Sequence, residues 1–190
     1  MDEIGINTGK HMMIRTAVLE DANRLLEIYA FYVKKTAISF EYDVPSLGQF
    51  TSRIENTLKK YPYLVVEDNG EIRGYTYAGN FRTRAAYDRS CEVTIYVCHD
   101  DRGKGYGRSL YEALEERLKS QGILNLYANI ASPIAEDEFL TRNSELFHEH
   151  LGFVKVGEFH KCGYKFGRWY NMICMEKIIG KHDSEMFSSG

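Results

Sequence analysis

The chain has 190 residues, of which 44% are hydrophobic and 27% are charged, a balance typical of a globular rather than a disordered protein. This length suits one domain of ordinary size. The net charge of −3 gives no basis for a nucleic-acid-binding surface. There is no secretory signal and no apolar run near the roughly 20 residues that a membrane-spanning helix needs, so we expect a soluble, cytoplasmic protein without a membrane partner.

The four cysteines are Cys91, Cys98, Cys162 and Cys174. They form no C-x-x-C pair and no spacing typical of zinc ligands. We therefore expect reduced thiols and no metal site.

The two ends of the chain differ from the part between them. Residues 1–12 lead into a His11-Met12-Met13 junction that is typical of a leader left by cloning, and we leave them out of the fold. Residues 179–190 are polar and are expected to form a flexible tail. Residues 13–178 contain no internal repeat, linker or low-complexity segment and are predicted to form a single domain.

Hydrophobic periodicity and turn residues predict mixed strands and helices in this domain. Asp68-Asn69-Gly70 is a hairpin-turn signal, and Gly122 is a typical residue after a helix C-terminus. The pattern predicts one α/β domain with a central mixed, largely antiparallel twisted sheet and helices on both faces. In chain order we expect a strand at 13–17, helices at 20–34 and 45–60, strands at 63–67, 72–78 and 91–97, a helix ending near Gln121, a strand at 124–131, a helix at 139–150, and strands at 154–159 and 168–176.

The most informative segment follows the strand at 91–97. Glycine occupies every second position of 103–107, directly before an amphipathic helix. Such a loop points unpaired backbone N–H groups at one spot before a helix N-terminus, which suits a phosphate or pyrophosphate. A dinucleotide fingerprint is excluded because Arg108 stands where its third glycine should be, and no P-loop string occurs. The remaining pattern is R-x-x-G-x-G, formed by Arg102, Gly105 and Gly107.

In its strand–loop–helix setting, this pattern resembles the signature loop of the GNAT superfamily of acetyl-CoA-dependent N-acetyltransferases. Five further blocks, in family order across roughly 13–178, resemble the phosphinothricin acetyltransferase group. These blocks are Ser39-Phe40-Glu41, 75–78, 81–88, 148–153 and 163–169. The resemblance implies a GNAT-type fold, acetyl-CoA as cofactor and a homodimer. It also implies direct transfer of acetyl to the primary amine of a small amino-acid-like substrate, of the phosphinothricin, methionine sulfoximine or methionine sulfone type.

For the cofactor, the resemblance implies that the glycine loop and the strand before it bind acetyl-CoA. The strand backbone is expected to pair with the pantetheine arm, and the loop to hold the pyrophosphate. A plain glycine turn is the alternative. The implied cofactor-binding residues are Ile95, Tyr96, Val97, Arg102, Gly103, Lys104, Gly105, Tyr106, Gly107, Arg108 and Asn143.

The resemblance also implies two catalytic residues. Glu92 matches the position of the family's catalytic Glu and is expected to act as general base through a water. His148 matches the His of the H-E-x-L-G-[FY] block and is expected to hold substrate, tune Glu92 or assist proton transfer. The alternatives are a solvent-facing Glu92 and a structural His148. The adjacent His150 is expected to face solvent.

The acceptor pocket is expected beside the loop that enters the strand of Glu92. Arginines there suit a carboxylate or phosphinate, because a guanidinium grips planar anions with two hydrogen bonds. A solvated charged loop is the alternative. The implied substrate-binding residues are Phe40, Arg82, Thr83, Arg84, Tyr87, Val93 and Thr94.

The segment 132–144 departs from the family pattern, since it is several residues longer and acidic. Thr141 occupies the position of a cofactor-contacting Asn, and we expect Asn143 to replace it. Because this loop borders the acceptor pocket, other amines stay open as acceptors: an antibiotic, a polyamine or a protein N-terminus. A non-catalytic acyl-CoA-binding module is the remaining alternative.

Overall fold

The computed structural model describes residues 12–183. Residues 1–11 of the expected leader and 184–190 of the expected tail therefore lie outside the described residues. Met12, which we counted with the leader, is the first residue of a strand. None of the helices in the described part of the chain is long and apolar enough to cross a membrane.

Seven strands form one sheet in the order β1-β2-β3-β4-β5-β7-β6. Only the central pair, β4 and β5, is parallel, and every other neighbouring pair is antiparallel. This arrangement confirms the predicted mixed, largely antiparallel sheet. The strands are β1 (Met12–Thr16), β2 (Tyr63–Asp68), β3 (Glu71–Asn80), β4 (Ser90–Val97), β5 (Asn125–Ser132), β6 (Val154–Lys165) and β7 (Arg168–Ile178).

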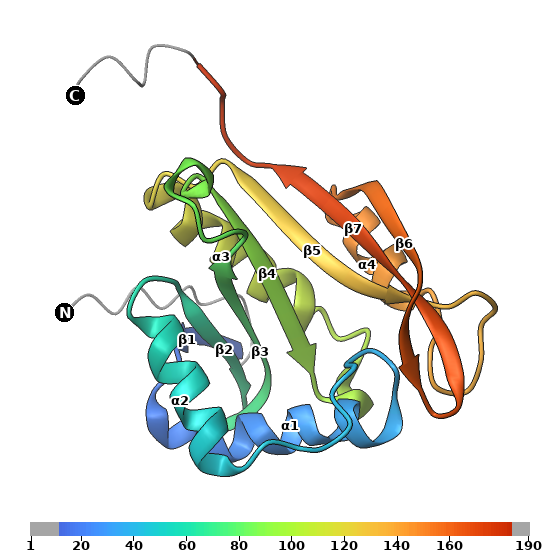
Figure 1. Ribbon diagram of the computed structural model, residues 1–190. Helices are drawn as coiled ribbons and strands as arrows, with labels where there is room; N and C mark the ends of the chain where they lie inside the picture. The colour runs from blue at the N-terminus through green and yellow to red at the C-terminus, as the bar shows by residue number, and fades with distance from the viewer. Residues whose placement is uncertain (1–11, 184–190) are drawn as a thin grey trace.

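Helices pack against both faces of the sheet, as predicted (Figure 1). On the first face, α3 (Tyr106–Ser120) contributes to a core with the strands, and α4 (Asn143–His150) packs beside it. On the second face, α1 (Ala22–Lys35) and α2 (Leu47–Leu58) form another core against β2 and β3. Three short 3-10 helices connect these elements, at Leu19–Asp21, Ala85–Tyr87 and His99–Asp101.

Several predicted element boundaries differ from the observed ones by one or more residues, and three of these differences have an identifiable local reason. Helix α2 begins at Leu47 because the hydroxyl of Ser46 caps it. Helix α4 begins at Asn143 rather than at 139, because the Asp137 carboxylate accepts the N–H groups of two following residues and holds a turn there. Strand β6 continues past 159, because an irregularity in its register between 159 and 163 interrupts the strand pattern without ending the strand.

The β6–β7 hairpin is attached to the end of α1 by a buried lysine. The ammonium of Lys165 donates to the carbonyls of Val33, Thr36 and Ser39 at 2.8, 2.9 and 2.6 Å. Its side chain is 2% exposed, and burial lowers its pKa. The C-terminal carbonyls of a helix need such donors, so Lys165 fixes the loop after α1 against the hairpin.

We expect Lys165→Met to destabilise the fold by about 3 kcal/mol, since three buried carbonyls lose their donor while the desolvation cost of the ammonium is relieved. Urea unfolding followed by fluorescence measures this change. Lys34→Met, an exposed position on α1, is the matched control and should change stability by less than about 0.5 kcal/mol. Equal stability of the two variants would contradict the proposed attachment.

Candidate functional site

The two central strands separate partway along the sheet. β4 pairs with β5 only over Ser90–Glu92 and Asn125–Tyr127, and beyond Glu92 the strands spread apart (Figure 1). Past that point β4 still pairs with β3, and β5 with β7. The edges that face one another across the gap therefore carry unpaired backbone groups, which an extended ligand can pair with.

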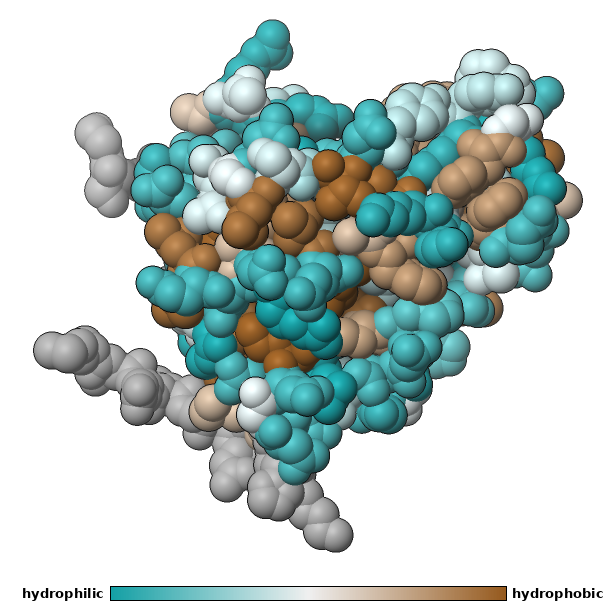
Figure 2. Space-filling model, turned by 90° about the horizontal axis from the view of Figure 1, so that it is seen from below, coloured by the Kyte–Doolittle hydropathy of each residue, from teal (hydrophilic) through white to brown (hydrophobic). Residues whose placement is uncertain are grey.

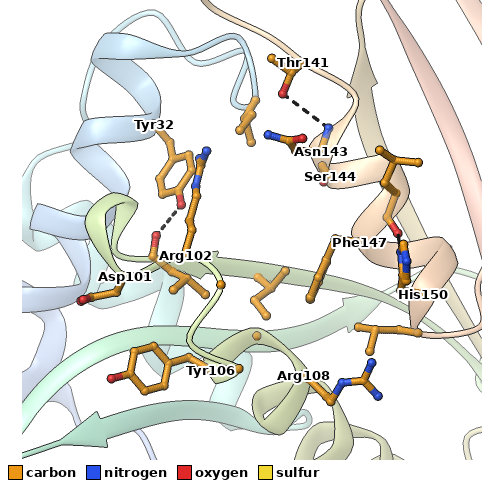
Figure 3. Close-up of a pocket in the computed structure, with 18 residues that line it drawn as sticks. Tyr32, Asp101, Arg102, Tyr106, Arg108, Thr141, Asn143, Ser144, Phe147 and His150 are labelled. Atoms are coloured by element: carbon orange, nitrogen blue, oxygen red, sulfur yellow. Dashed lines mark hydrogen bonds between the residues drawn. The ribbon is translucent and has the colours of Figure 1, made fainter.

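A cavity of about 520 Å³ lies at this gap. It lies between the glycine loop, the N-terminal end of α3, one side of α4 and two residues from the α1 side, Tyr32 and Ile38 (Figure 3). Its lining residues are Tyr32, Ile38, Ile95, Val97, Asp101, Arg102, Gly103, Gly105, Tyr106, Gly107, Arg108, Thr141, Asn143, Ser144, Leu146, Phe147, His150 and Leu151.

The glycine loop gives this cavity an anion-binding end. Gly103 and Gly105 have φ of 80° and 89°, a conformation that other residues rarely adopt. Gly105 is the N-cap of α3, and no side chain caps the helix or places a carboxylate in its first turn. Its first N–H groups and dipole are therefore available to a ligand, and Arg102 and Arg108 add positive charge at the cavity wall.

Gly107 lines the cavity and also permits close packing beside it. A Cβ at this position would lie 2.9 Å from the ring of Phe147 on α4. The glycine thus allows α3 and α4 to come close at the cavity, where Phe147 forms part of the lining.

Nine of the eleven predicted cofactor-binding residues line the cavity, and Tyr96 and Lys104 do not. The ring of Tyr96 lies on the second face of the sheet, 5.1 Å from that of Tyr29, because side chains alternate along β4. The ammonium of Lys104 is held by Asp101 at 2.5 Å.

Sequence reasoning missed nine lining residues. Several lie on one face of α4 at helical spacing, a signal that the predicted helix at 139–150 already contained. His150, expected only to face solvent, is exposed and also borders the cavity. The missed residues are Tyr32, Ile38, Asp101, Thr141, Ser144, Leu146, Phe147, His150 and Leu151.

His148, predicted to be catalytic, lies outside the cavity lining and is 3% exposed. Its Nδ1 lies 2.7 Å from the carbonyl of Ser144 and therefore carries the proton, so its Nε2 accepts from the hydroxyl of Tyr111 at 2.9 Å. Burial lowers its pKa to about 4. A neutral imidazole with both nitrogens occupied joins α4 to α3, and we assign it no role in proton transfer.

Glu92, the predicted base, is the last β4 residue paired with β5, at the point where the gap opens. Its side chain is partly buried and, by strand alternation, lies on the second face, opposite to that of Val93. Helices α1 and α2 pack against this face over β2 and β3, and α1 also reaches β4, where the rings of Tyr29 and Tyr32 contact that of Tyr96. Figure 2 views the molecule from the side of these two helices, where hydrophobic side chains gather in the middle and hydrophilic ones surround them.

The predicted substrate residues lie in different places. Arg82, Thr83, Arg84 and Tyr87 belong to the exposed loop between β3 and β4. Phe81 anchors this loop by stacking on Tyr127 of β5 at 4.0 Å, and the Arg82 guanidinium lies over the Phe81 ring at 4.4 Å.

The other three substrate residues come from two elements. Val93 is 4% exposed in the core of the first face, which corrects its predicted contact with substrate. Thr94 lies on the second face, and its carbonyl accepts from the hydroxyl of Thr76 at 2.8 Å. The Phe40 ring packs closely on Gly163 of the β6–β7 hairpin, since a Cβ built on Gly163 would lie only 2.4 Å from the ring.

The site combines a parallel strand pair that separates, a glycine loop and an uncapped helix. This combination defines a class of α/β domain that binds an extended, phosphate-bearing ligand, as an acyl-CoA-dependent transferase does. Comparison with known proteins agrees with this class. The profile of the acetyltransferase (GNAT) domain matches residues 14–174. The chain therefore belongs to the GNAT acetyltransferase family, which confirms the predicted family and fold, an N-acetyltransferase activity and acetyl-CoA as the donor.

Individual relatives are similar over most of their length. The chain is 32% identical over 174 residues to phosphinothricin N-acetyltransferase of Alcaligenes faecalis, covering 91% of this chain and 85% of that one. It is 33% identical over 165 residues to the L-methionine sulfoximine/L-methionine sulfone acetyltransferase of Pseudomonas aeruginosa, covering 86% and 92%. A crystal structure of phosphinothricin acetyltransferase from Sinorhizobium meliloti in complex with acetyl-CoA has a TM-score of 0.81 at 32% identity, covering 89% of each chain.

Proposed function

We propose that the chain transfers acetyl from acetyl-CoA to the α-amine of a small amino-acid-like acceptor in a ternary complex. The observation that carries the proposal is Glu92 at the mouth of the gap between β4 and β5. Past Glu92, β4 continues to Ile95 and Val97, which line the glycine-loop cavity, while the side chain of Glu92 lies on the second face of the sheet.

The cavity residues fit acetyl-CoA, which supplies an acetyl thioester. The uncapped start of α3, with Arg102 and Arg108, would hold the pyrophosphate. The unpaired edge of β4 at 95–97 would pair with the pantetheine arm, and the side chains of Ile95, Val97 and Phe147 give that arm an apolar wall.

Glu92 would act as the general base. The acceptor amine is an ammonium at neutral pH and must lose a proton before its nitrogen lone pair can attack. A partly buried carboxylate at the end of the gap can take this proton through one water.

Relatives named for phosphinothricin and for methionine sulfoximine or sulfone support an amino-acid-like acceptor. The exposed arginines of the β3–β4 loop, Arg82 and Arg84, support an acceptor that carries an anionic group. A polyamine or aminoglycoside is the second candidate, because the segment at 136–138 is acidic and such acceptors are polycationic. Arg168 pairs with Asp137 at 3.0 Å and with Glu138 at 2.7 Å, which neutralises part of that charge and makes this candidate the weaker one.

A spectroscopic assay of CoA thiol release, with acetyl-CoA and a panel of amines, tests the proposal. We expect turnover with at least one of phosphinothricin, methionine sulfoximine and methionine sulfone. Failure of all three, together with turnover of a polyamine, would overturn the amino-acid assignment. Binding of acetyl-CoA without turnover of any amine would favour a non-catalytic module.

We also propose that the protein is a homodimer and acts in the cytoplasm. β6 is an edge strand of the sheet, and it carries Val154, Val156 and Phe159, each at least half exposed. Such an apolar edge is suited to a second copy of the chain. The four free cysteines support a reducing compartment. Light scattering should give the mass of two chains, and the mass of one would refute the dimer.

A further inference from the structure

Asn129 lies on β5 just past the level of Glu92 and has no role in the function proposed so far. Tyr127 is the Cα partner of Glu92 in the last pair of β4 with β5. Asn129 follows two residues later, so its side chain lies on the same face, about 7 Å further along the strand. It is exposed, and it borders the gap.

The amide of Asn129 is oriented by a thiol. Cys174 is its Cα partner on β7, and the thiol donates to Oδ1 of Asn129 at 2.9 Å. Because a thiol is the donor here, the amide oxygen faces Cys174 and the NH₂ group points away from it. Within residues 12–183, no hydrogen bond engages that NH₂ group.

The charges around this amide complement an α-amino acid. The Arg82 guanidinium lies over the Phe81 ring at 4.4 Å. That ring stacks at 4.0 Å on Tyr127, the Cα partner of Glu92. Arg82 and Glu92 also act in opposite directions on the pKa of the Cys174 thiol, which burial raises. The Glu92 carboxylate can therefore receive the ammonium of an amino acid. On the same open surface, the Arg82 guanidinium and the Asn129 amide N–H can receive its carboxylate.

We propose that Asn129 is a specificity-determining residue whose N–H donates to the α-carboxylate of the acceptor, and that Cys174 is a positioning residue that holds the amide in this orientation. The inference rests on the proposed function, since it assumes an α-amino acid as acceptor. It adds the requirement that the acceptor carry a carboxylate next to its amine.

The test compares methionine sulfone with its decarboxylated amine, 3-(methylsulfonyl)propan-1-amine, which keeps the reacting nitrogen but has no carboxylate. Asn129→Ala should lower kcat/KM for methionine sulfone roughly 10–100-fold, mainly through KM, because a hydrogen bond to a charged group is lost. Its kcat/KM for the amine should stay within about twofold. Asn129→Asp should lower kcat/KM for methionine sulfone further, because the new side-chain carboxylate repels the carboxylate of the acceptor.

Variants of Cys174 separate positioning from packing. Cys174→Ser keeps a donor for Oδ1 of Asn129 and should keep the wild-type ratio of the two kcat/KM values. Cys174→Ala removes the donor to Oδ1 of Asn129, so the amide of Asn129 can rotate. This variant should lower the ratio of kcat/KM for methionine sulfone to kcat/KM for the amine. Asn125→Ala is the matched control, since Asn125 lies on the same strand and face but donates to Ser90 at 3.2 Å, and it should leave the ratio unchanged.

Each other outcome is decisive. If Asn129→Ala lowers kcat/KM equally for both acceptors, Asn129 acts on a group that both share, and the carboxylate assignment is wrong. If kcat/KM changes for neither acceptor, Asn129 does not touch the acceptor. If the wild-type enzyme acetylates neither acceptor, nor any other amino acid of the panel, the proposed function fails and the inference fails with it.

Discussion

Replacing Glu92 with Gln should lower kcat by roughly 10²–10⁴-fold, the range that general base catalysis contributes. Gln is nearly isosteric with Glu, so the strand and the gap stay intact, but a neutral amide cannot accept the proton that the acceptor ammonium must lose. Since Glu92 is not among the residues that line the donor cavity, the dissociation constant of acetyl-CoA should stay within about twofold. Steady-state kinetics and calorimetric titration with acetyl-CoA measure the two quantities.

Glu176→Gln is the matched control for this variant. Glu176 is a partly buried carboxylate on β7, and its Cα partner is Tyr127, the same residue that pairs with Glu92 from the other side. Its loss should leave kcat within about threefold. Unchanged turnover in Glu92→Gln would remove Glu92 as the base, and equal losses in both variants would indicate a general electrostatic effect.

The glycine loop that lines the cavity could be predicted from sequence, because its geometry is local. Two glycines with positive φ before a helix specify an anion-binding loop within a few residues. The hairpin at 68–70 was predicted for the same reason, and Asn69 and Gly70 both have the positive φ that such a turn needs.

The role of His148 depends on the environment of its side chain, which is formed in part by distant residues of the chain. Motif matching selected a histidine that titrates near neutrality, but Tyr111 and Phe153 surround the ring and burial lowers its pKa to about 4. Phe153 belongs to the same sequence block as His148, but Tyr111, which bonds to the ring, lies 37 residues away. Val93 is a similar case, since only the packing of helix α3 against its face of β4 shows that this face is a core.

The acceptor side was only partly accessible to sequence reasoning, because it is assembled from several strands and loops. Glu92, Asn129 and Cys174 come from β4, β5 and β7, and the order β4-β5-β7 that brings them together skips β6. A linear pattern does not contain that order. The loop at 81–88 could be placed near Glu92 only because it leads directly into β4.

The largest effect on donor binding is expected for Gly105→Val. Gly105 caps α3 with a φ of 89°, and a Cβ there would meet no atom within 4 Å, so the cost comes from backbone conformation rather than from collision. A β-branched residue at positive φ costs about 1–3 kcal/mol. The loop can relieve this strain by moving to negative φ, which turns the N–H groups of the first turn of α3 away from the cavity.

We therefore expect Gly105→Val to weaken acetyl-CoA binding by at least about 100-fold, since a few kcal/mol of lost charged hydrogen bonds correspond to that factor. Gly70→Val is the control matched for strain, because Gly70 has a φ of 77° and equally open surroundings but lies in the β2–β3 hairpin turn. Both variants should lose similar thermal stability, and only Gly105→Val should lose acetyl-CoA in calorimetric titration. If Gly105→Val instead keeps wild-type affinity for acetyl-CoA, the pyrophosphate does not bind at this loop, and the donor must enter the gap from another side.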